Sequence, residues 1–189
     1  MGLEVVSEHL NGLIVLKPKL FGDERGFFME SWRADEFEQL GLPTHFVQDN
    51  HSRSARGVLR GMHFQWNPPQ DKLIRVTRGR AYVVELDIRP GSPTLGKWFG
   101  IELSQENMLQ LWVPAGFANG FCSLEDNTEM QYKVTSLWNK PGEGSICWDD
   151  PRANIDWPID DPLTSEKDSL AMTLDEWLIQ KESDNFMYE

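Results

Sequence analysis

The segment GVLRGMHFQ, residues 57–65, carries two groups capable of chemistry, Arg60 and His63, within an otherwise apolar run. An imidazole has an ordinary pKa of about 6.5, so it can accept and release protons near neutral pH. A guanidinium stays charged and binds anions or oxygen atoms through several N–H donors. Neither group enters apolar surroundings without a partner or a function. The segment therefore predicts a site inside the fold.

Further basic residues cluster close to this segment, although the chain as a whole is acidic. The formal net charge is −12, from 18 basic and 30 acidic side chains, which argues against nucleic acid or an anionic membrane as a partner. Basic residues gathered in one cleft would still suit an anionic small molecule, and a solvated strand face is the alternative. The residues concerned are Arg53, Arg56, Arg60, Lys72, Arg75 and Arg78.

Cysteine usage and hydropathy bear on the cellular compartment. Cys122 and Cys147 have no metal-ligand spacing; they fit a reducing compartment, with one disulfide as the open alternative. The start MGLEVVSEHL has neither a basic region nor an apolar stretch typical of a signal peptide. No apolar run has membrane-spanning length. We expect a cytoplasmic protein of one domain, 1–189, with a core over about 12–160 and a C-terminal helical segment over about 164–181.

The elements that must position these side chains are mostly short strands separated by turns such as PGSP, PAG and KPGEG. Alternation is clearest at 82–89, where Tyr82, Val84, Leu86 and Ile88 share one face. This pattern predicts a mainly β fold, a jelly-roll barrel or sandwich with short peripheral helices. The expected strands are LIVLKP, GFFMESW, FVQDNHS, GVLRGMHFQ, KLIRVTRG, AYVVELDIR, WFGIELS, MLQLWVP and MQYKVTSLW.

Helices are expected in two places. Residues 34–41 read as a short helix ended by Gly41, and a second helix is expected within 164–181, capped by Thr164 or Ser165. The last residues, ESDNFMYE, are expected to fray. Strict alternation puts Arg60 and His63 on opposite faces of their strand, whereas a bulge at Gly61 would turn both inward.

The spacing of two motifs resembles the metal-binding motifs of cupin barrels, but most of the metal ligands are missing. Only His63 remains of the four expected ligands, because Gln65, Gln70 and Asn119 stand at the other positions, and one imidazole with neutral amides is a poor divalent-metal site. A metal-dependent cupin oxygenase or isomerase is therefore an alternative that would need bound metal. The matching residues are Gly57, His63, Gln65 and Gly79 for the first motif and Pro114, Gly116 and Asn119 for the second.

Longer blocks extend the resemblance over residues 12 to 175. DERGFFMESW, FVQDNHSRSARGVLRGMHFQ, DKLIRVTRG, DIRPGSPTLGKW, ENMLQLWVPAGFANGF, EMQYKVTS, ICWDDPRANIDWP and LTSEKDSL together resemble the dTDP-4-dehydrorhamnose 3,5-epimerase family of cupin-type nucleotide-sugar epimerases. The resemblance implies a cofactor-independent, metal-free enzyme that inverts C3, C5 or both in a dTDP-linked 4-keto-6-deoxyhexose. A proton next to a ketone becomes removable when donors stabilise the enolate oxygen, and inversion needs a base on one face and an acid on the other.

The resemblance also implies a role for each catalytic candidate. His63 would be the base, Asp168 of SEKD would fix its tautomer, Tyr132 would be the acid and Lys72 would stabilise the enolate. Arg60 would bind the diphosphate or assist at the keto oxygen. The structural alternatives are a core histidine, a half-buried strand tyrosine, a solvent-facing lysine and an arginine in a structural ion pair.

The remaining binding candidates also follow from the resemblance. It places Lys167 near a phosphate and two residues near the base, Trp138 and Glu143. It places around the nucleotide Arg25, Phe28, Glu30, Gln48 and Asn50. It implies a homodimer in which N-terminal strands join the neighbour's sheet, so that Arg25 and Phe28 would serve the partner's active site.

Two departures from the family pattern affect the expected chemistry. The family has a His–carboxylate pair at the positions of Asn119 and Val83, so both partners are absent here. Asn119 is expected to donate a hydrogen bond to a sugar hydroxyl or keto oxygen, but not to transfer protons. Trp138 stands where the family often has a second tyrosine. Two alternatives follow: a single-carbon epimerase on a related nucleotide sugar, and a nucleotide-sugar-binding cupin without turnover.

Overall fold

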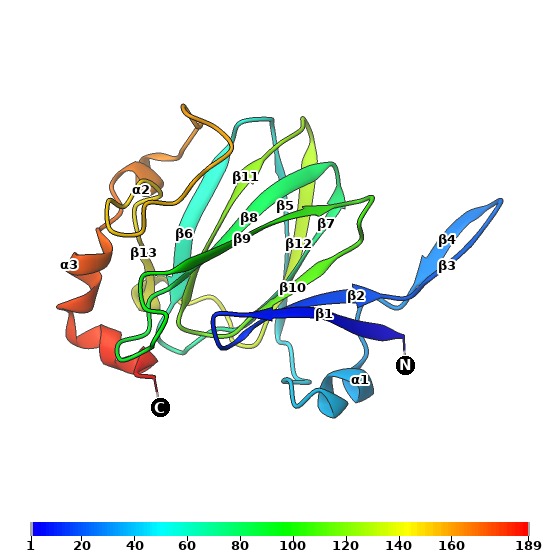
Figure 1. Cartoon of the computed structure of the whole chain (residues 1–189), viewed down its shortest axis with the longest axis horizontal. Helices are drawn as coiled ribbons and strands as arrows, with labels where there is room; N and C mark the ends of the chain where they lie inside the picture. The colour runs from blue at the N-terminus through cyan, green and yellow to red at the C-terminus, as the bar shows by residue number, and fades with distance from the viewer. Residues whose placement is uncertain (1, 189) are drawn as a thin grey trace.

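The computed structural model describes residues 2–188, and two antiparallel sheets dominate them (Figure 1). One sheet has the order β1 (Leu3–His9), β2 (Leu13–Pro18), β10 (Gln110–Val113), β7 (Lys72–Arg78), β12 (Thr128–Val134), β5 (Gln48–Ser54). The other has the order β13 (Glu143–Ser145), β6 (Leu59–Gln65), β11 (Phe117–Ser123), β8 (Arg80–Asp87), β9 (Trp98–Ser104). The mainly β, jelly-roll fold predicted from the strand pattern is confirmed.

The inner faces of the two sheets meet in an apolar core. Strands of the first sheet contribute Leu13, Val15, Ile74, Val76, Leu111 and Met130, and strands of the second contribute Val83, Leu103, Phe117 and Phe121. Because successive side chains of a strand alternate in direction, Glu85 and Asp87 follow Val83 on this inner face of β8. The polar side chains of the site therefore project from the same sheet faces as the core.

The opposite face of the second sheet is also buried, because the C-terminal part of the chain packs on it. Val84, Leu86 and Ile88 contact a cluster that includes Trp157 and Trp177. Burial on both faces explains why the residues of β8 after Arg80 are apolar on both faces of the strand apart from Glu85 and Asp87.

The expected helix at 34–41 is present as α1 (Ala34–Gln39), and Gly41 follows it with φ +70°. The expected single helix at 164–181 is instead two helices, α2 (Glu166–Ser169) and α3 (Leu174–Leu178). Between them Met172 pairs with Ile146 in a parallel bridge, which requires extended backbone. Ser165 caps α2 and Thr173 caps α3, so the second helix has a start signal of its own.

The expectation that the C-terminal residues fray is wrong for those described. Residues 181–186 form the 3-10 helix η2 (Lys181–Phe186). Phe186 is 5 % exposed and packs on Phe64 and Trp177. Tyr188 donates its backbone N–H to Pro90 O at 2.9 Å. Apolar burial thus ties this segment to the barrel; Glu189 lies outside the described residues.

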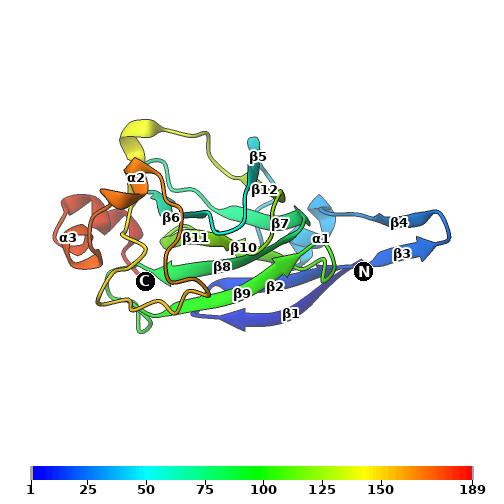
Figure 2. The same cartoon turned by 90° about the horizontal axis from the view of Figure 1, so that it is seen from above.

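A two-stranded hairpin, β3 (Leu20–Asp23) and β4 (Gly26–Met29), extends away from both sheets (Figures 1 and 2). Its aromatic side chains Phe21, Phe27 and Phe28 are all more than half exposed. A short 3-10 turn, η1 (Lys140–Gly142), comes directly before β13.

Both cysteines, Cys122 and Cys147, are free thiols, so the alternative of one disulfide does not hold. None of the helices within residues 2–188 has the length and hydropathy to span a membrane.

Candidate active site

A cavity of about 530 Å³ lies between the two sheets. His63 enters it from β6 in one sheet, and Tyr132 enters it from β12 in the other. The volume is in the range of small-molecule sites. The cavity is lined by Gln48, Asn50, Ser52, Arg60, His63, Phe64, Gln65, Gln70, Lys72, Asn119, Phe121, Met130, Tyr132, Trp138 and Glu143.

A bulge in β6 brings Arg60 and His63 to the same cavity. His63 pairs with Asn119 and Arg60 with Phe121, so three steps on β6 match two on β11. Gly61 lies within this irregularity at φ +140°, and a Cβ there would come 2.5 Å from Gly120 Cα. Glycine tolerates this positive φ, so the strand can bulge at Gly61 and turn both Arg60 and His63 towards the cavity.

His63 is held by a carboxylate from the C-terminal segment. Its Nε2 lies 2.5 Å from Asp168 Oδ1, and Ser165 Oγ donates to Asp168 Oδ2 at 2.9 Å. Burial acts to raise the pKa of Asp168, but the hydrogen bonds from His63 and Ser165 outweigh it and lower that pKa. The ionised carboxylate keeps a proton on Nε2, which leaves the lone pair on Nδ1.

Lys72, which is buried, and Tyr132, which is half-buried, lie on the sheet opposite His63. Lys72 is 7 % exposed, and its Nζ donates to the His63 carbonyl at 3.2 Å; it is therefore not a solvent-facing lysine. Burial lowers the pKa of Lys72 and raises the pKa of Tyr132. The positive charge of Arg60 acts to lower the pKa of Tyr132, which indicates that these two side chains are close.

The cavity rim carries a continuous chain of polar contacts. Lys167 Nζ lies 2.8 Å from Glu143 Oε1, and Trp138 Nε1 donates to Glu143 Oε2 at 3.1 Å. The backbone N–H of Trp138 donates to Gln48 Oε1 at 3.1 Å, and Gln48 Nε2 donates to Asn50 Oδ1 at 2.8 Å. These contacts place Trp138, itself 58 % exposed, beside the cavity mouth.

The expectation that Asn119 stands without a carboxylate partner is wrong. Asn119 Nδ2 donates to Glu85 Oε1 at 2.5 Å, across a direct β11–β8 register pair. Val83, where the resemblance locates the family's acid, is instead packed in the apolar core. Glu85 lies two residues further along the same face of β8, so a carboxylate is present at a shifted position. The amide nitrogen expected to contact sugar is therefore already committed to Glu85.

Glu85 is the residue that sequence reasoning missed. It is 0 % exposed, and burial raises its pKa against the opposing influence of the Lys72 charge and the Asn119 hydrogen bond. The sequence did contain a signal for this residue: Glu85 is an acid that lies between Val83 and Asp87 on the face of β8 that points inward. Sequence alone did not show that this phase faces a cavity.

Three expected binding residues lie away from this cavity within one chain. Arg25 pairs with Asp23 on the β3–β4 hairpin, and Phe28 lies on the same hairpin. Glu30 follows the hairpin and pairs with Arg33. None of the three lines the cavity, and of the basic cluster in the sequence only Arg60 and Lys72 do.

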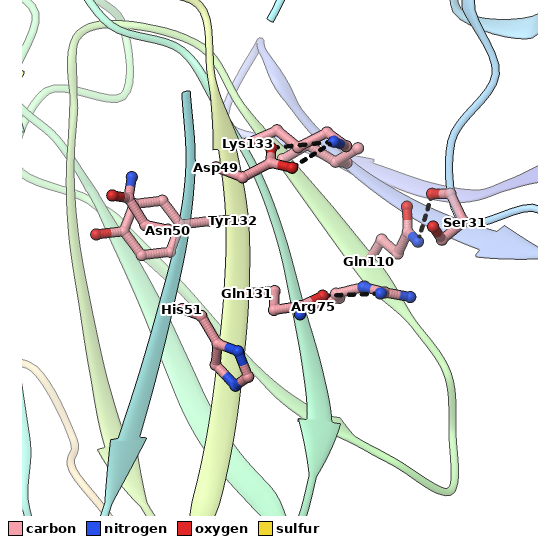
Figure 3. Close-up of a pocket in the computed structure, with 10 residues that line it drawn as sticks. Ser31, Asp49, Asn50, His51, Arg75, Gln110, Gln131, Tyr132 and Lys133 are labelled. Atoms are coloured by element: carbon pink, nitrogen blue, oxygen red, sulfur yellow. Dashed lines mark hydrogen bonds and ion pairs between the residues drawn. The ribbon is translucent and has the colours of Figure 1, made fainter. Parts of the chain in front are cut away.

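A smaller cavity, about 280 Å³, lies on the outer face of the first sheet. Figure 3 shows Arg75, Gln131 and Lys133 on one side of β12, whereas Tyr132 projects to the other. Arg75 Nη2 donates to Gln131 Oε1 at 2.8 Å, and Lys133 pairs with Asp49 at 3.0 Å. Arg75 and Lys133, two basic groups of this smaller cavity, are thus already bound to side chains of the same sheet. Residues 2–188 contain no group of three or more His, Cys, Asp or Glu side chains placed to hold a metal ion.

Comparison with known proteins agrees with the sequence resemblance. The family model for dTDP-4-dehydrorhamnose 3,5-epimerase matches residues 7–176. A dTDP-4-dehydrorhamnose 3,5-epimerase from Pseudomonas aeruginosa is 53% identical over 158 residues, 82% of this chain and 87% of the relative. One from Shigella flexneri is 49% identical over 168 residues, 88% and 93% respectively.

The solved structures include one that matches nearly the whole chain. The crystal structure of a dTDP-6-deoxy-D-glucose-3,5-epimerase from Legionella pneumophila, in complex with dTDP-4-keto-L-rhamnose, superposes with a TM-score of 0.93 at 43% identity and covers 99% of each chain. The fold, the order of the motifs and the sequence identity of this chain all agree with those relatives. The chain belongs to the dTDP-4-dehydrorhamnose 3,5-epimerase family.

Proposed function

We propose that this protein is a cofactor-independent epimerase that inverts C3, C5 or both in a dTDP-4-keto-6-deoxyhexose, with dTDP-4-dehydrorhamnose as the substrate. The observation that carries the proposal is a base and an acid on opposite walls of one cavity: His63 on β6 and Tyr132 on β12. Inversion at carbon requires proton removal from one face of the ring and return to the other. The membership of this chain in the dTDP-4-dehydrorhamnose 3,5-epimerase family supports dTDP-4-dehydrorhamnose as the substrate.

His63 is the proposed base. The ionised Asp168 fixes the proton on Nε2, so Nδ1 can accept the proton from the carbon next to the ketone. The imidazolium that forms is stabilised by Asp168, which is 3 % exposed and therefore weakly screened by water.

Lys72 and Tyr132 complete the proposed chemistry. As a buried ammonium, Lys72 would stabilise the negative charge that develops on the keto oxygen, because such charge is held more strongly where water is excluded. Tyr132 would then deliver its phenolic proton to the opposite face of the carbon. Burial raises the pKa of Tyr132, which keeps it in the donor form until that step.

The rim residues suit the nucleotide end of the substrate. We propose Arg60 for the diphosphate, since its guanidinium lines the cavity and is bound to a neutral partner, Ser54 Oγ, at 3.1 Å. Trp138, Glu143 and Lys167 would contact the base and a phosphate, and Gln48 and Asn50 would hold this side of the rim.

The exchange of solvent deuterium into the substrate tests the proposed chemistry. Wild-type protein incubated in deuterium oxide with the dTDP-4-keto sugar should incorporate deuterium at C3, C5 or both, read by NMR. His63→Ala should slow exchange at every position by about 10²–10⁴-fold, while dTDP binding by calorimetry stays within threefold. Tyr132→Phe should lower inversion more than exchange, because proton removal does not use the phenol.

The positions that exchange distinguish the remaining alternatives. Exchange at one carbon alone would identify a single-carbon epimerase. Binding of the nucleotide sugar with no exchange at all would identify a binding cupin and overturn the proposed catalysis.

We further propose that the protein works as a homodimer in the cytoplasm. The exposed Phe21, Phe27 and Phe28 of the hairpin support an interface, because an isolated apolar hairpin gains stability when covered. In such a dimer Arg25, Phe28 and Glu30 would reach the partner's site. Sedimentation should give a dimer mass, and Phe27→Asp should shift the equilibrium to monomer; a monomeric wild type would contradict the dimer. The two free thiols support the location.

A further inference from the structure

Glu85 is a buried carboxyl behind the cavity wall, and the mechanism proposed above does not use it. It is 0 % exposed and is not itself among the lining residues. Its neighbours Asn119 and Lys72 both line the cavity. A change at Glu85 can therefore reach the substrate through these two side chains.

The partners of Glu85 are too few for a buried anion. Oε1 accepts one hydrogen bond, from the neutral Asn119 amide, and Oε2 has no partner within residues 2–188. No cation lies within ion-pair distance of Glu85 in the same range. A buried carboxylate needs several donors or a close cation. The carboxylic acid, by contrast, has its carbonyl oxygen bound by Asn119 and leaves only a neutral O–H without an acceptor, which costs less than a buried charge with the same partners.

The strand register connects Glu85 to the proposed base. Glu85 on β8 pairs with Asn119 on β11, and Asn119 pairs with His63 on β6. The three side chains thus form one row on the inner face of the sheet. Because Asn119 Nδ2 is turned towards Glu85, its Oδ1 is the atom left to face the cavity.

The protonation state of Glu85 matters because of Lys72. The charges of Glu85 and Glu143 both raise the pKa of Lys72, which burial lowers. An anionic Glu85 would neutralise much of the field that the ammonium offers to an enolate, whereas an uncharged Glu85 leaves that field intact.

We propose that Glu85 is a positioning residue of this active site that works as an uncharged carboxylic acid: it orients Asn119 with its carbonyl oxygen towards the substrate and leaves the positive charge of Lys72 available to the enolate. Ionisation of Glu85 at alkaline pH then switches the site off. The inference rests on the proposed epimerase function and adds to it a residue and a pH dependence.

Other titratable or charged groups lie around this row. His63, Asp168 and Glu143 lie on the side of the second sheet and the C-terminal segment; Lys72, Tyr132 and Arg60 border the cavity. Lys72 and Glu85 interact, so the first alkaline proton lost belongs to the pair. Removing one of two groups that can lose this proton raises the apparent pKa of the step.

The decisive variant is Glu85→Gln, which keeps the shape, accepts the Asn119 hydrogen bond and cannot ionise. Its kcat/KM for deuterium exchange at pH 7 should stay within about threefold of wild type, and the alkaline limb of kcat/KM against pH should move to higher pH. Infrared spectra should show a protonated carboxyl band in wild-type protein that Glu85→Gln lacks. The control Glu102→Gln alters a partly exposed acid on β9 that is paired with Arg80 and does not line the cavity, and it should leave both readouts unchanged.

Two results would overturn the assignment of Glu85. An alkaline limb that stays in place or moves to lower pH would mean that Glu85 is ionised and supports Lys72. A loss of activity of 100-fold or more in Glu85→Gln would mean that the charge itself is needed. If the epimerase proposal itself is wrong, wild-type protein should show no deuterium exchange at any pH. The infrared band would still report whether Glu85 is protonated, so the two proposals can fail separately.

Discussion

Glu85 and Asp87 lie two residues apart on the same face of β8, and both are 0 % exposed, yet their surroundings shift their pKa values in opposite directions. Asp87 accepts hydrogen bonds from Arg89 Nε at 2.9 Å and Arg89 Nη2 at 2.8 Å, from Ser92 Oγ at 2.6 Å and from Thr94 Oγ1 at 2.7 Å. Burial acts to raise the pKa of Asp87, but these donors outweigh it and lower that pKa. Burial raises the pKa of Glu85 to about 8.

The comparison teaches that donors, rather than burial, decide the charge of an acid inside this barrel. Asp87 uses its charge to hold structure: Arg89, fixed by Asp87, also donates to Leu10 O at 2.8 Å and to Asn11 O at 3.1 Å, and it packs over the ring of Tyr188. Glu85 has one neutral donor and borders a cavity. A carboxyl with few partners next to a site is a functional candidate.

The largest effect on this comparison is expected from Asp87→Asn. This change leaves the buried Arg89 without its counter-charge, so the free energy of unfolding should fall by about 3–5 kcal/mol, measured by urea denaturation at pH 7. The exchange activity of the folded fraction should be unchanged, because the partners of Asp87 lie outside the cavity.

Glu102→Gln is the control for that loss, with an expected change within about 0.5 kcal/mol. A loss of stability below about 1 kcal/mol in Asp87→Asn would show that the hydrogen bonds from Arg89, Ser92 and Thr94 to Asp87 do not stabilise this part of the fold. The contrast between the two acids would then not hold.

A pH-dependent effect is expected from Glu85→Gln. In the unfolded chain the carboxyl ionises near its ordinary pKa, whereas in the folded chain it holds its proton up to about 8. The unfolded state therefore binds fewer protons between these values, and wild-type stability falls as pH rises through this window. Glu85→Gln removes that loss, so its advantage over wild type should grow from near zero at pH 4 to roughly 3–5 kcal/mol at pH 8.

Thermal unfolding of both proteins from pH 4 to pH 8 measures this difference. Asp87→Asn should show no such growth over this range, because an acid with a lowered pKa contributes stability that is fully present above its ordinary pKa and is lost only as pH falls through the lowered value. A difference between Glu85→Gln and wild type that does not vary with pH would contradict an uncharged Glu85.

Much of the fold could be predicted from strand patterns and turns. The nine expected strand segments each overlap an observed strand, because one-sided burial and turn residues leave a direct trace in sequence. β1, β3, β11 and β13 were missed, β1 and β11 for different reasons. β1 is largely polar at the edge of its sheet, and β11 starts inside the PAGFANGF motif, where glycine suggests turns.

The site was predicted in part. The structure brings His63, Lys72, Tyr132, Asn119 and Trp138 to one cavity, and the motif blocks of the family pointed to each of them. Glu85 was missed because its partner is 34 residues away in sequence and is found only through the β8–β11 register. Arg25, Phe28 and Glu30 lie outside the cavity of a single chain, which no reading of one sequence could decide.

Residue types, turn residues and alternation are local properties, so they already indicate which side chains are available for chemistry and that these belong on a barrel of short strands. Which of these side chains share a cavity, and which acid faces Asn119, became clear from the three-dimensional arrangement alone. The reason is that strand register and the bulge at Gly61 depend on pairing between distant segments. A shift of one residue reverses the face of every side chain that follows.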